Sequence, residues 1–169
     1  MHTQLSEEYR LDVFTRVSPV IPSNVNIDGQ LAIAIWYNNG CVGYASVSKG
    51  LDEYYGGEFF PDLCDKVRGE WVIVQIQKGN SDLPKGNFRN LLVRFLVERA
   101  QAAGISRIYF MSSDRNYWTI PEVQEQMLEQ LKPLPNEATI RHNYDWTAKR
   151  NKFRYDPKTN LFVKDLVPQ

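Results

Sequence analysis

The sequence has few of the residues that build metal sites or disulfide frameworks. Cys41 and Cys64 are its two cysteines, and His2 and His142 are its two histidines. Two cysteines cannot make a disulfide framework, and these two lie too far apart for a metal-binding pair. Two histidines are too few for a histidine-rich zinc site. We therefore expect no metal cofactor, and reduced thiols as in a cytoplasmic protein.

Long apolar runs and a net charge are missing as well. The longest apolar stretch, residues 31–37, is far shorter than the roughly 20 residues that span a bilayer. The first residues have neither the basic start nor the apolar core of a secretory signal. The 20 basic and 20 acidic side chains cancel, so no overall field favours nucleic acid or an anionic membrane. We expect a cytoplasmic protein without a membrane partner.

What the sequence does have is enough apolar material for one core. Its 169 residues are 43% hydrophobic and 12% aromatic, which suits a single domain over residues 1–169. The charges are unevenly spread, since residues 1–70 hold ten acidic and five basic side chains whereas residues 141–169 hold three and seven. The N-terminal part is therefore acidic and the C-terminal end basic.

The N-terminal part is predicted to be antiparallel. Residues 11–20 indicate an extended segment, and residues 30–37 and 42–47 are β-rich runs separated by an Asn-Asn-Gly turn. Asn-Gly is typical of a tight hairpin because both residues accept a positive φ. Residues 50–65 then form an acidic, aromatic and glycine-rich segment that predicts a loop with a short helix over residues 61–67.

The middle of the chain predicts a strand, a helix and a second strand parallel to the first. Residues 70–77 are apolar nearly throughout, as in a strand buried on both faces. An apolar stripe with a 3.6-residue period begins at Phe88, and Gly104 provides the C-terminal stop. Residues 105–111 supply the next strand, which completes a crossover unit.

The last third predicts a second crossover and a closing antiparallel pair. Thr119 and Glu122 have the spacing of a capping box, which opens a helix that stops before Pro133. Residues 138–146 are predicted to be a strand, and residues 152–155 and 161–166 flank a turn. The prediction is one α/β domain with a mixed sheet.

The loop before the long helix has the features of a phosphate site. It reads Leu-Pro-Lys-Gly-Asn over residues 83–87, so it combines a basic residue with a glycine directly before the helix. The first N–H groups of a helix lack intrahelical partners and lie at the positive end of its dipole, which stabilises an anion. We expect a phosphorylated cofactor at this position.

This order of elements resembles the GNAT superfamily of acyl-CoA-dependent N-acyltransferases over nearly the whole chain. In that family, a loop such as Arg-x-x-Gly-x-Ala holds the pyrophosphate of coenzyme A, and Gly86 matches its glycine. Leu83 stands at the basic position and Phe88 at the small one, although Phe88 lies on the apolar stripe and is expected to turn inward. The resemblance implies acetyl-CoA or another acyl-CoA as cofactor, with contacts from Lys85, Gly86, Asn87, Phe88 and Arg89.

The resemblance also implies where acyl transfer takes place. The peptide N–H groups of Ile76 and Gln77 would polarise the thioester carbonyl. Asn116 matches the family's asparagine after the fifth strand, but Val123 stands seven residues later where the family has a tyrosine acid, so Tyr117 is the substitute candidate.

The attacking amine must be neutral, which requires a nearby proton acceptor. The candidate carboxylates are Glu70, Glu58 and Asp62. For any single one of them, a solvated surface carboxylate is the simpler explanation.

Three functions remain open at this level. The first is N-acyl transfer to a small-molecule or protein amine, by a monomer or a homodimer. The second is a non-catalytic binding or regulatory module of the same fold. The third and least favoured is nucleic-acid binding by basic residues interleaved with aromatic ones, although alternation within a strand produces the same pattern without a ligand. The residues of that third candidate are Arg141, Tyr144, Trp146, Lys149, Arg150, Lys152, Phe153, Arg154, Tyr155 and Lys158.

Overall fold

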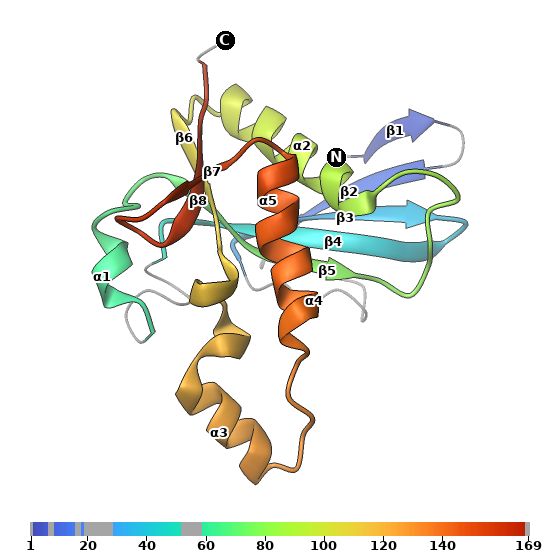
Figure 1. The fold of residues 1–169 in the computed structure, drawn as a ribbon. Helices are drawn as coiled ribbons and strands as arrows, with labels where there is room; N and C mark the ends of the chain where they lie inside the picture. The colour runs from blue at the N-terminus through green and yellow to red at the C-terminus, as the bar shows by residue number, and fades with distance from the viewer. Residues whose placement is uncertain (1, 7–8, 16–17, 19–28, 52–58, 168–169) are drawn as a thin grey trace.

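The computed structural model describes residues 2–6, 9–15, 18, 29–51 and 59–167. They form an α/β structure around a mixed sheet of eight strands in the order β1-β2-β3-β4-β5-β6-β8-β7 (Figure 1). The α/β class expected from the sequence is therefore confirmed.

The first strands form an antiparallel meander. β1 (His2–Ser6), β2 (Tyr9–Thr15), β3 (Leu31–Tyr37) and β4 (Gly40–Lys49) pair in chain order. β1 is an addition to the predicted elements, and β2 covers the first part of the segment expected over residues 11–20. The hairpin is confirmed, but Tyr37 pairs with Gly40, so the loop residues with positive φ are Asn38 (47°) and Asn39 (63°) rather than Asn39 and Gly40.

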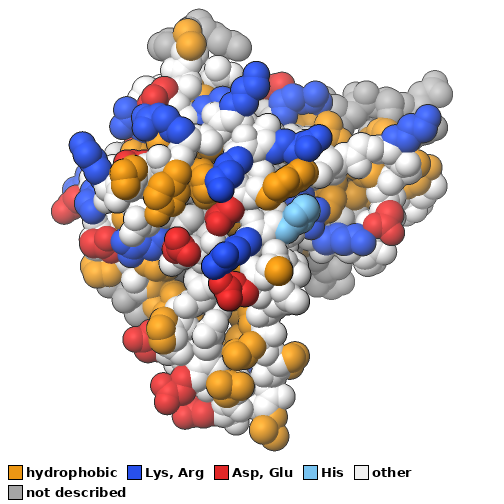
Figure 2. Space-filling view, viewed as in Figure 1, with side chains coloured by type: hydrophobic (Ala, Val, Ile, Leu, Met, Phe, Trp, Pro, Cys, Tyr) orange, Lys and Arg blue, Asp and Glu red, His pale blue; other side chains and the backbone are white. Residues whose placement is uncertain are grey.

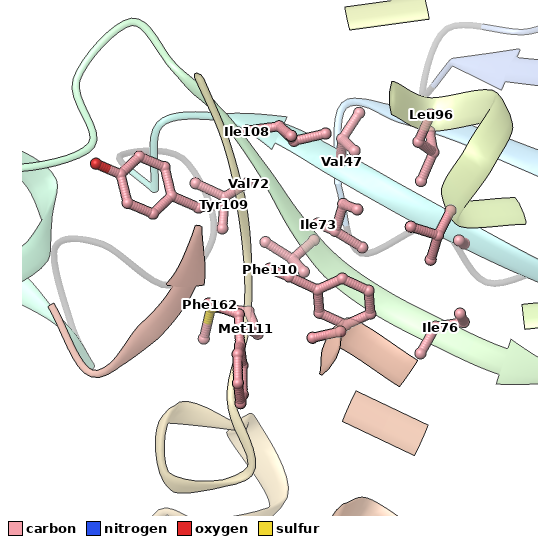
Figure 3. Packing of buried hydrophobic residues seen from close by; sticks show 14 of the residues in the cluster. Val47, Val72, Ile73, Ile76, Leu96, Ile108, Tyr109, Phe110, Met111 and Phe162 are labelled. Atoms are coloured by element: carbon pink, nitrogen blue, oxygen red, sulfur yellow. The ribbon is translucent and has the colours of Figure 1, made fainter. Parts of the chain in front are cut away.

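The predicted crossover is also confirmed. α1 (Pro61–Cys64) precedes β5 (Trp71–Lys78), α2 (Phe88–Ala102) and β6 (Arg107–Phe110), and β6 pairs parallel to β5. Gly104 has a φ of +73° just after α2, as a helix stop requires. Leu92 and Leu96 of α2 are fully buried in the same cluster as Ile73 and Phe110, which joins the helix to the central strands (Figure 3).

The segment after β6 differs from the prediction. It forms η2 (Ser113–Arg115), η3 (Tyr117–Thr119) and α3 (Pro121–Glu129). The predicted capping box is wrong, because Ile120 is the N-cap of α3 and the Thr119 hydroxyl donates to the carbonyl oxygens of Ser113 (2.9 Å) and Asn116 (2.8 Å). A second parallel crossover does not follow in the described chain, since the next strands are antiparallel.

The strand predicted over residues 138–146 is wrong as well. The chain there forms α4 (Glu137–Arg141), a π-helical turn η4 (His142–Trp146) and α5 (Thr147–Arg150), which follow one another without a break. Asn136 begins this helical segment by accepting hydrogen bonds from the backbone of Ala138 and Thr139, and Ile140 and Tyr144 are buried four residues apart on it. The closing strands, β7 (Arg154–Asp156) and β8 (Leu161–Asp165), are antiparallel as predicted, and β8 lies between β7 and β6.

Candidate functional site

The parallel strands β5 and β6 separate partway along the sheet. Residues 71–73 pair with residues 108–110, and a last hydrogen bond joins the Met111 N–H to the Ile73 carbonyl at 3.0 Å. β6 ends at Phe110, whereas β5 continues to Lys78. Figure 3 shows β5 leading away toward Ile76 while the chain at Phe110 and Met111 turns from it. One edge of β5 over residues 74–78 thus has no neighbouring strand in the described chain. We call this opening the wedge.

A β-bulge sets which peptide groups face the wedge. Val47 pairs with Ile73 and Ser46 with Gln75, so Val74 is an extra residue on β5. Gly79 N–H donates to the Val42 carbonyl at 2.8 Å, so the peptide groups of residue 79 face β4. Peptide groups alternate between the two edges of a strand, so those of Gln77, two residues earlier, also face β4. The Ile76 peptide groups therefore face the wedge, as its expected role requires, and those of Gln77 do not.

A cavity of about 350 Å³ lies against this edge of β5. Three segments line it: β5, the chain that connects β6 to α4, and the helical segment 137–150. Tyr144 in this lining is buried, and its ring meets Phe110 edge to face at 6.1 Å. The lining residues are Ile76, Gln77, Lys78, Trp118, Pro135, Asn136, Thr139, Ile140, Asn143 and Tyr144.

Asn143 gives the cavity a buried hydrogen-bond acceptor. Its side-chain oxygen Oδ1 is inaccessible to solvent and accepts no hydrogen bond from the part of the chain that the structure describes. An acceptor left in this state costs about 1–3 kcal/mol. Asn143 belongs to the π-helical turn η4, and such turns occur frequently at functional sites. A ligand that brings an N–H or O–H donor into the cavity would pair with this oxygen after a movement of the Asn143 side chain exposes it.

A second hollow, of about 520 Å³, lies beside the start of α2. Its lining includes four basic side chains and no acidic one: Lys85, Arg94, Arg150 and Lys164. Gly86 is also in the lining; its φ is +94°, and a Cβ there would meet nothing within 4 Å. Glycine is thus favoured by the backbone conformation, and open space lies in front of it. The hollow is suited to an anion.

Lys164 adds to this electropositive character. Its Nζ donates to the Asn151 carbonyl at 2.9 Å and lies 5.6 Å from the centroid of the Phe153 ring. Partial burial, followed by the charge of Lys152, lowers the pKa of Lys164. A partly desolvated ammonium group is stabilised by a nearby negative charge, so a bound anion would restore that pKa.

The start of α2 is already partly capped. Asn87 Oδ1 accepts hydrogen bonds from the N–H groups of Arg89 (3.0 Å) and Asn90 (3.4 Å). Phe88 turns inward, as expected, and is 8% exposed. The Arg89 guanidinium lies over the Phe88 ring at 4.6 Å, and burial lowers its pKa. Lys85, Gly86 and Asn87 therefore line the basic hollow, whereas Phe88 and Arg89 do not.

The other expected site residues lie elsewhere. Asn116 is buried and its Oδ1 accepts from the Trp118 N–H at 3.1 Å, and the Tyr117 ring packs against Phe59 and Trp118. Glu70 accepts from the Ser106 hydroxyl at 3.3 Å, six residues before Ile76 and thus about 20 Å from it along the strand.

Of the two remaining carboxylates, one is paired and one is not described. Asp62 pairs with Arg115 at 2.8 Å. Glu58 lies outside the described residues. Neither Asn116, Tyr117, Glu70 nor Asp62 lines the cavity at the wedge.

Sequence reasoning missed the residues that the helical segment brings to the site. They are Asn136, Asn143, Tyr144 and Arg150, which begin, belong to or end a helical segment whose residues 138–146 were predicted to be a strand. An asparagine cap, followed by apolar residues at Ile140 and Tyr144, was the available signal.

Contacts within the C-terminal part of the chain weaken the nucleic-acid alternative. Arg141 pairs with Glu137 at 2.7 Å and Arg154 with Asp165 at 3.3 Å. The Trp146 ring is stacked on His142 at 4.8 Å and has the Arg150 guanidinium over it, also at 4.8 Å. A ring covered in this way is a poor platform for a stacked base.

Comparisons with known proteins add no evidence on the function of this site. No protein-family model, no curated protein and no solved structure matches the chain. None of the described helices is both long and apolar enough to cross a membrane. Among the described residues, no three or more histidine, cysteine, aspartate or glutamate side chains are grouped so that they could hold a metal ion.

Proposed function

We propose that the chain is a GNAT-type N-acyltransferase that uses acetyl-CoA or another acyl-CoA. The observation that carries this proposal is the wedge between two parallel strands, with the basic hollow at the start of the helix that connects them. In the GNAT fold, a splay between the fourth and fifth strands admits the pantetheine arm of coenzyme A. β5 and β6 take those two places if β1 is an additional strand at the edge.

Each part of the site fits one part of an acyl-CoA. Lys85, Arg94, Arg150 and Lys164 supply positive charge for the phosphates. Ile76 presents its peptide groups at the open strand edge, and Asn143 Oδ1 offers an acceptor for an amide N–H. Bound acyl-CoA would supply an activated acyl group as a thioester, and a peptide N–H in the wedge would polarise its carbonyl.

The helical segment also offers the missing acid. In the family, an asparagine is followed seven residues later by a tyrosine. Asn136 is followed eight residues later by Tyr144, and the π-helical turn between them accommodates one additional residue. We assign to Asn136 and Tyr144 the roles first given to Asn116 and Tyr117, with the Tyr144 hydroxyl protonating the departing thiolate. Glu58 remains the candidate to take the proton of the amine.

One observation favours a non-catalytic binding module of the same fold as the second candidate. No carboxylate is among the described residues that line the cavity or the basic hollow. A domain without a proton acceptor for the amine would bind acyl-CoA and transfer nothing.

The first test is binding of acetyl-CoA, followed by thermal unfolding and calorimetry. A ligand at about 100 times its dissociation constant adds about 2.7 kcal/mol, and each kcal/mol raises the midpoint of a domain this size by about 2–4 °C. The variant Lys85→Ala/Arg150→Ala should bind at least tenfold more weakly. Lys132→Ala, an exposed lysine outside the hollow, is the matched control and should bind as the wild type does. No midpoint shift and no heat of binding at millimolar acetyl-CoA would refute the proposal.

The second test separates the enzyme from the binding module. Release of free thiol from acetyl-CoA is followed in the presence of a panel of small amines and lysine-bearing peptides. Turnover that falls at least tenfold in Tyr144→Phe, with acetyl-CoA affinity unchanged, supports the enzyme. Tight binding without turnover on any amine supports the module.

A further inference from the structure

Residues 120–135 form an arm that exposes apolar side chains. The arm contains α3, which projects from the body below the sheet in Figure 1. Val123 is buried at its base, and Gln124 Nε2 donates to the Trp118 carbonyl at 3.0 Å. Leu128, Leu131 and Leu134 are 58%, 93% and 43% exposed. Half of the large hydrophobic side chains exposed in the described chain therefore lie on this one short segment.

Leu131 is unusual in its backbone as well. Its φ is +54°, its N–H donates to the Leu128 carbonyl at 3.0 Å, and the next N–H, of Lys132, donates to Met127 at 2.9 Å. This is the position after a helix where glycine is favoured, because a Cβ is strained there. A leucine that is both strained and almost fully exposed stabilises neither the helix nor the core. Its side chain is available to a partner.

The charges of the arm indicate what kind of partner fits. Glu122, Glu125 and Glu129 are exposed and belong to no ion pair in the described chain, and Lys132 is the one basic residue of the arm. The arm is therefore an acidic surface around three leucines. A complementary surface would be basic and would contain exposed aromatic or aliphatic side chains.

The body of the same chain carries such a surface. Trp146 and Tyr155 are 37% and 44% exposed, and Lys149 lies 5.8 Å from the Phe162 ring, which in turn packs against Tyr155. Lys158 follows on the turn between β7 and β8. Together with Lys152, these residues are called here the basic face. Figure 2 shows lysine and arginine side chains over the body, interspersed with carboxylates and apolar side chains, and carboxylates and apolar side chains on the projecting part below.

We propose that the arm of one copy docks on the basic face of a second copy. The net charge of zero results from opposite charges on different parts of the chain. The exposed carboxylates of one copy's arm can therefore pair with the exposed lysines of the other copy's basic face. A two-fold arrangement places each arm on the partner's basic face and closes the assembly as a dimer. This contact is independent of the acyl-CoA proposal.

The test is the mass of the protein in solution, measured by light scattering and sedimentation between 1 and roughly 200 µM at about 0.15 M salt. The wild type should have twice the chain mass of 19.6 kDa at the upper concentrations. Glu125→Lys/Glu129→Lys and Lys149→Glu/Lys158→Glu should each be monomeric, and an equimolar mixture of the two should restore a mixed dimer. That recovery requires the two surfaces to meet each other.

Folding and the apolar contribution are tested in parallel. Circular dichroism should show that each charge variant is folded. Leu128→Ser/Leu131→Gly should raise the dimer dissociation constant at least tenfold while leaving the monomer at least as stable, since glycine relieves the strain at residue 131. Val167→Ser, exposed but outside both surfaces, is the control and should leave the dissociation constant unchanged. A wild type that is monomeric throughout, a dimer that survives the arm variants, or charge variants that do not recover on mixing would each overturn the proposal.

Discussion

At the scale of single residues, Gly43 is required for the inward position of Phe88. A Cβ at residue 43 would lie 2.4 Å from two Phe88 ring atoms and 2.8 Å from the Gln77 carbonyl oxygen. Gly43→Ala should therefore lower the free energy of unfolding by about 1–3 kcal/mol, the usual range for overpacking a core. Urea denaturation measures this loss.

The double variant Gly43→Ala/Phe88→Leu identifies the cause of that loss. It should recover part of the stability, because a smaller side chain relieves the ring contact while the Gln77 carbonyl remains close. If the single variant were as stable as the wild type, the position of the Phe88 ring would be contradicted.

Asn143 should respond in opposite directions in stability and in binding. Asn143→Leu removes a buried acceptor that accepts no hydrogen bond, so the free protein should gain about 1 kcal/mol. The same change removes a hydrogen bond to the ligand and should weaken acetyl-CoA binding about tenfold. Chemical denaturation and calorimetry measure the two effects, with Thr139→Val as a control in the same cavity. A variant that loses stability and keeps its affinity would show that Asn143 has a purely structural role.

At the scale of elements, the closing strands are joined by a cluster of three charged side chains that includes a titratable carboxylate. Asp165 on β8 receives hydrogen bonds from Arg107 on β6 (2.8 Å) and Arg154 on β7 (3.3 Å), which lower the pKa of its carboxyl group. A lowered carboxyl pKa stabilises the fold above the unfolded pKa of about 3.9, and this contribution is lost as the pH falls through the folded value.

Asp165→Asn tests this contribution. The side chains are largely exposed, so the variant should lose no more than about 1 kcal/mol at pH 7. Thermal unfolding from pH 7 to pH 2 should show a shallower acid decline in the variant than in the wild type. Parallel pH profiles for the two proteins would contradict the role of this cluster.

Elements with a single strong local signal could be predicted, and those decided by distant packing could not. The continuous apolar run of β5 indicates a buried strand, and the 3.6-residue spacing of the stripe that begins at Phe88 indicates the helix α2. The crossover was therefore predicted correctly. Residues 138–146 contain threonine, isoleucine, tyrosine and tryptophan, which favour a strand, but burial of Ile140 and Tyr144 on one side selects the helix. The π-helical turn has no sequence signature.

The assignment of residues 138–146 to a strand explains why most of the missed candidate-site residues were not identified. Lys85, Gly86 and Asn87 were candidates from the sequence because a loop before a helix can be identified locally, and they line the basic hollow. Asn143, Tyr144 and Arg150 were not, because their place at the site depends on a helix packed against β5 from some 70 residues away.

At the scale of the whole molecule, the two halves of the sheet differ in how far their strands stay paired. The meander from β1 to β4 is paired along its strands, with register shifts between residues 4 and 6 and between residues 35 and 36, whereas the parallel pair opens beyond Ile73 and meets the helical segment across a cavity. A ligand in the wedge would supply partners for the edge of β5 and would be held between two elements that lie far apart in the chain. Binding should therefore stabilise the interface of these elements more than the meander.

Hydrogen exchange tests this division. With saturating acetyl-CoA, the amides of Ile76 and Lys78, which alternate toward the wedge, and those of the segment 137–150 should exchange at least tenfold more slowly, because the strand edge gains hydrogen-bond partners and the helix is held against it. Amides of β2 and β3 should change little, and Lys85→Ala/Arg150→Ala should need at least tenfold more acetyl-CoA than the wild type to reach the same protection. Protection spread evenly over the sheet would place the ligand elsewhere, since a ligand bound outside the wedge has no reason to act on these two segments alone.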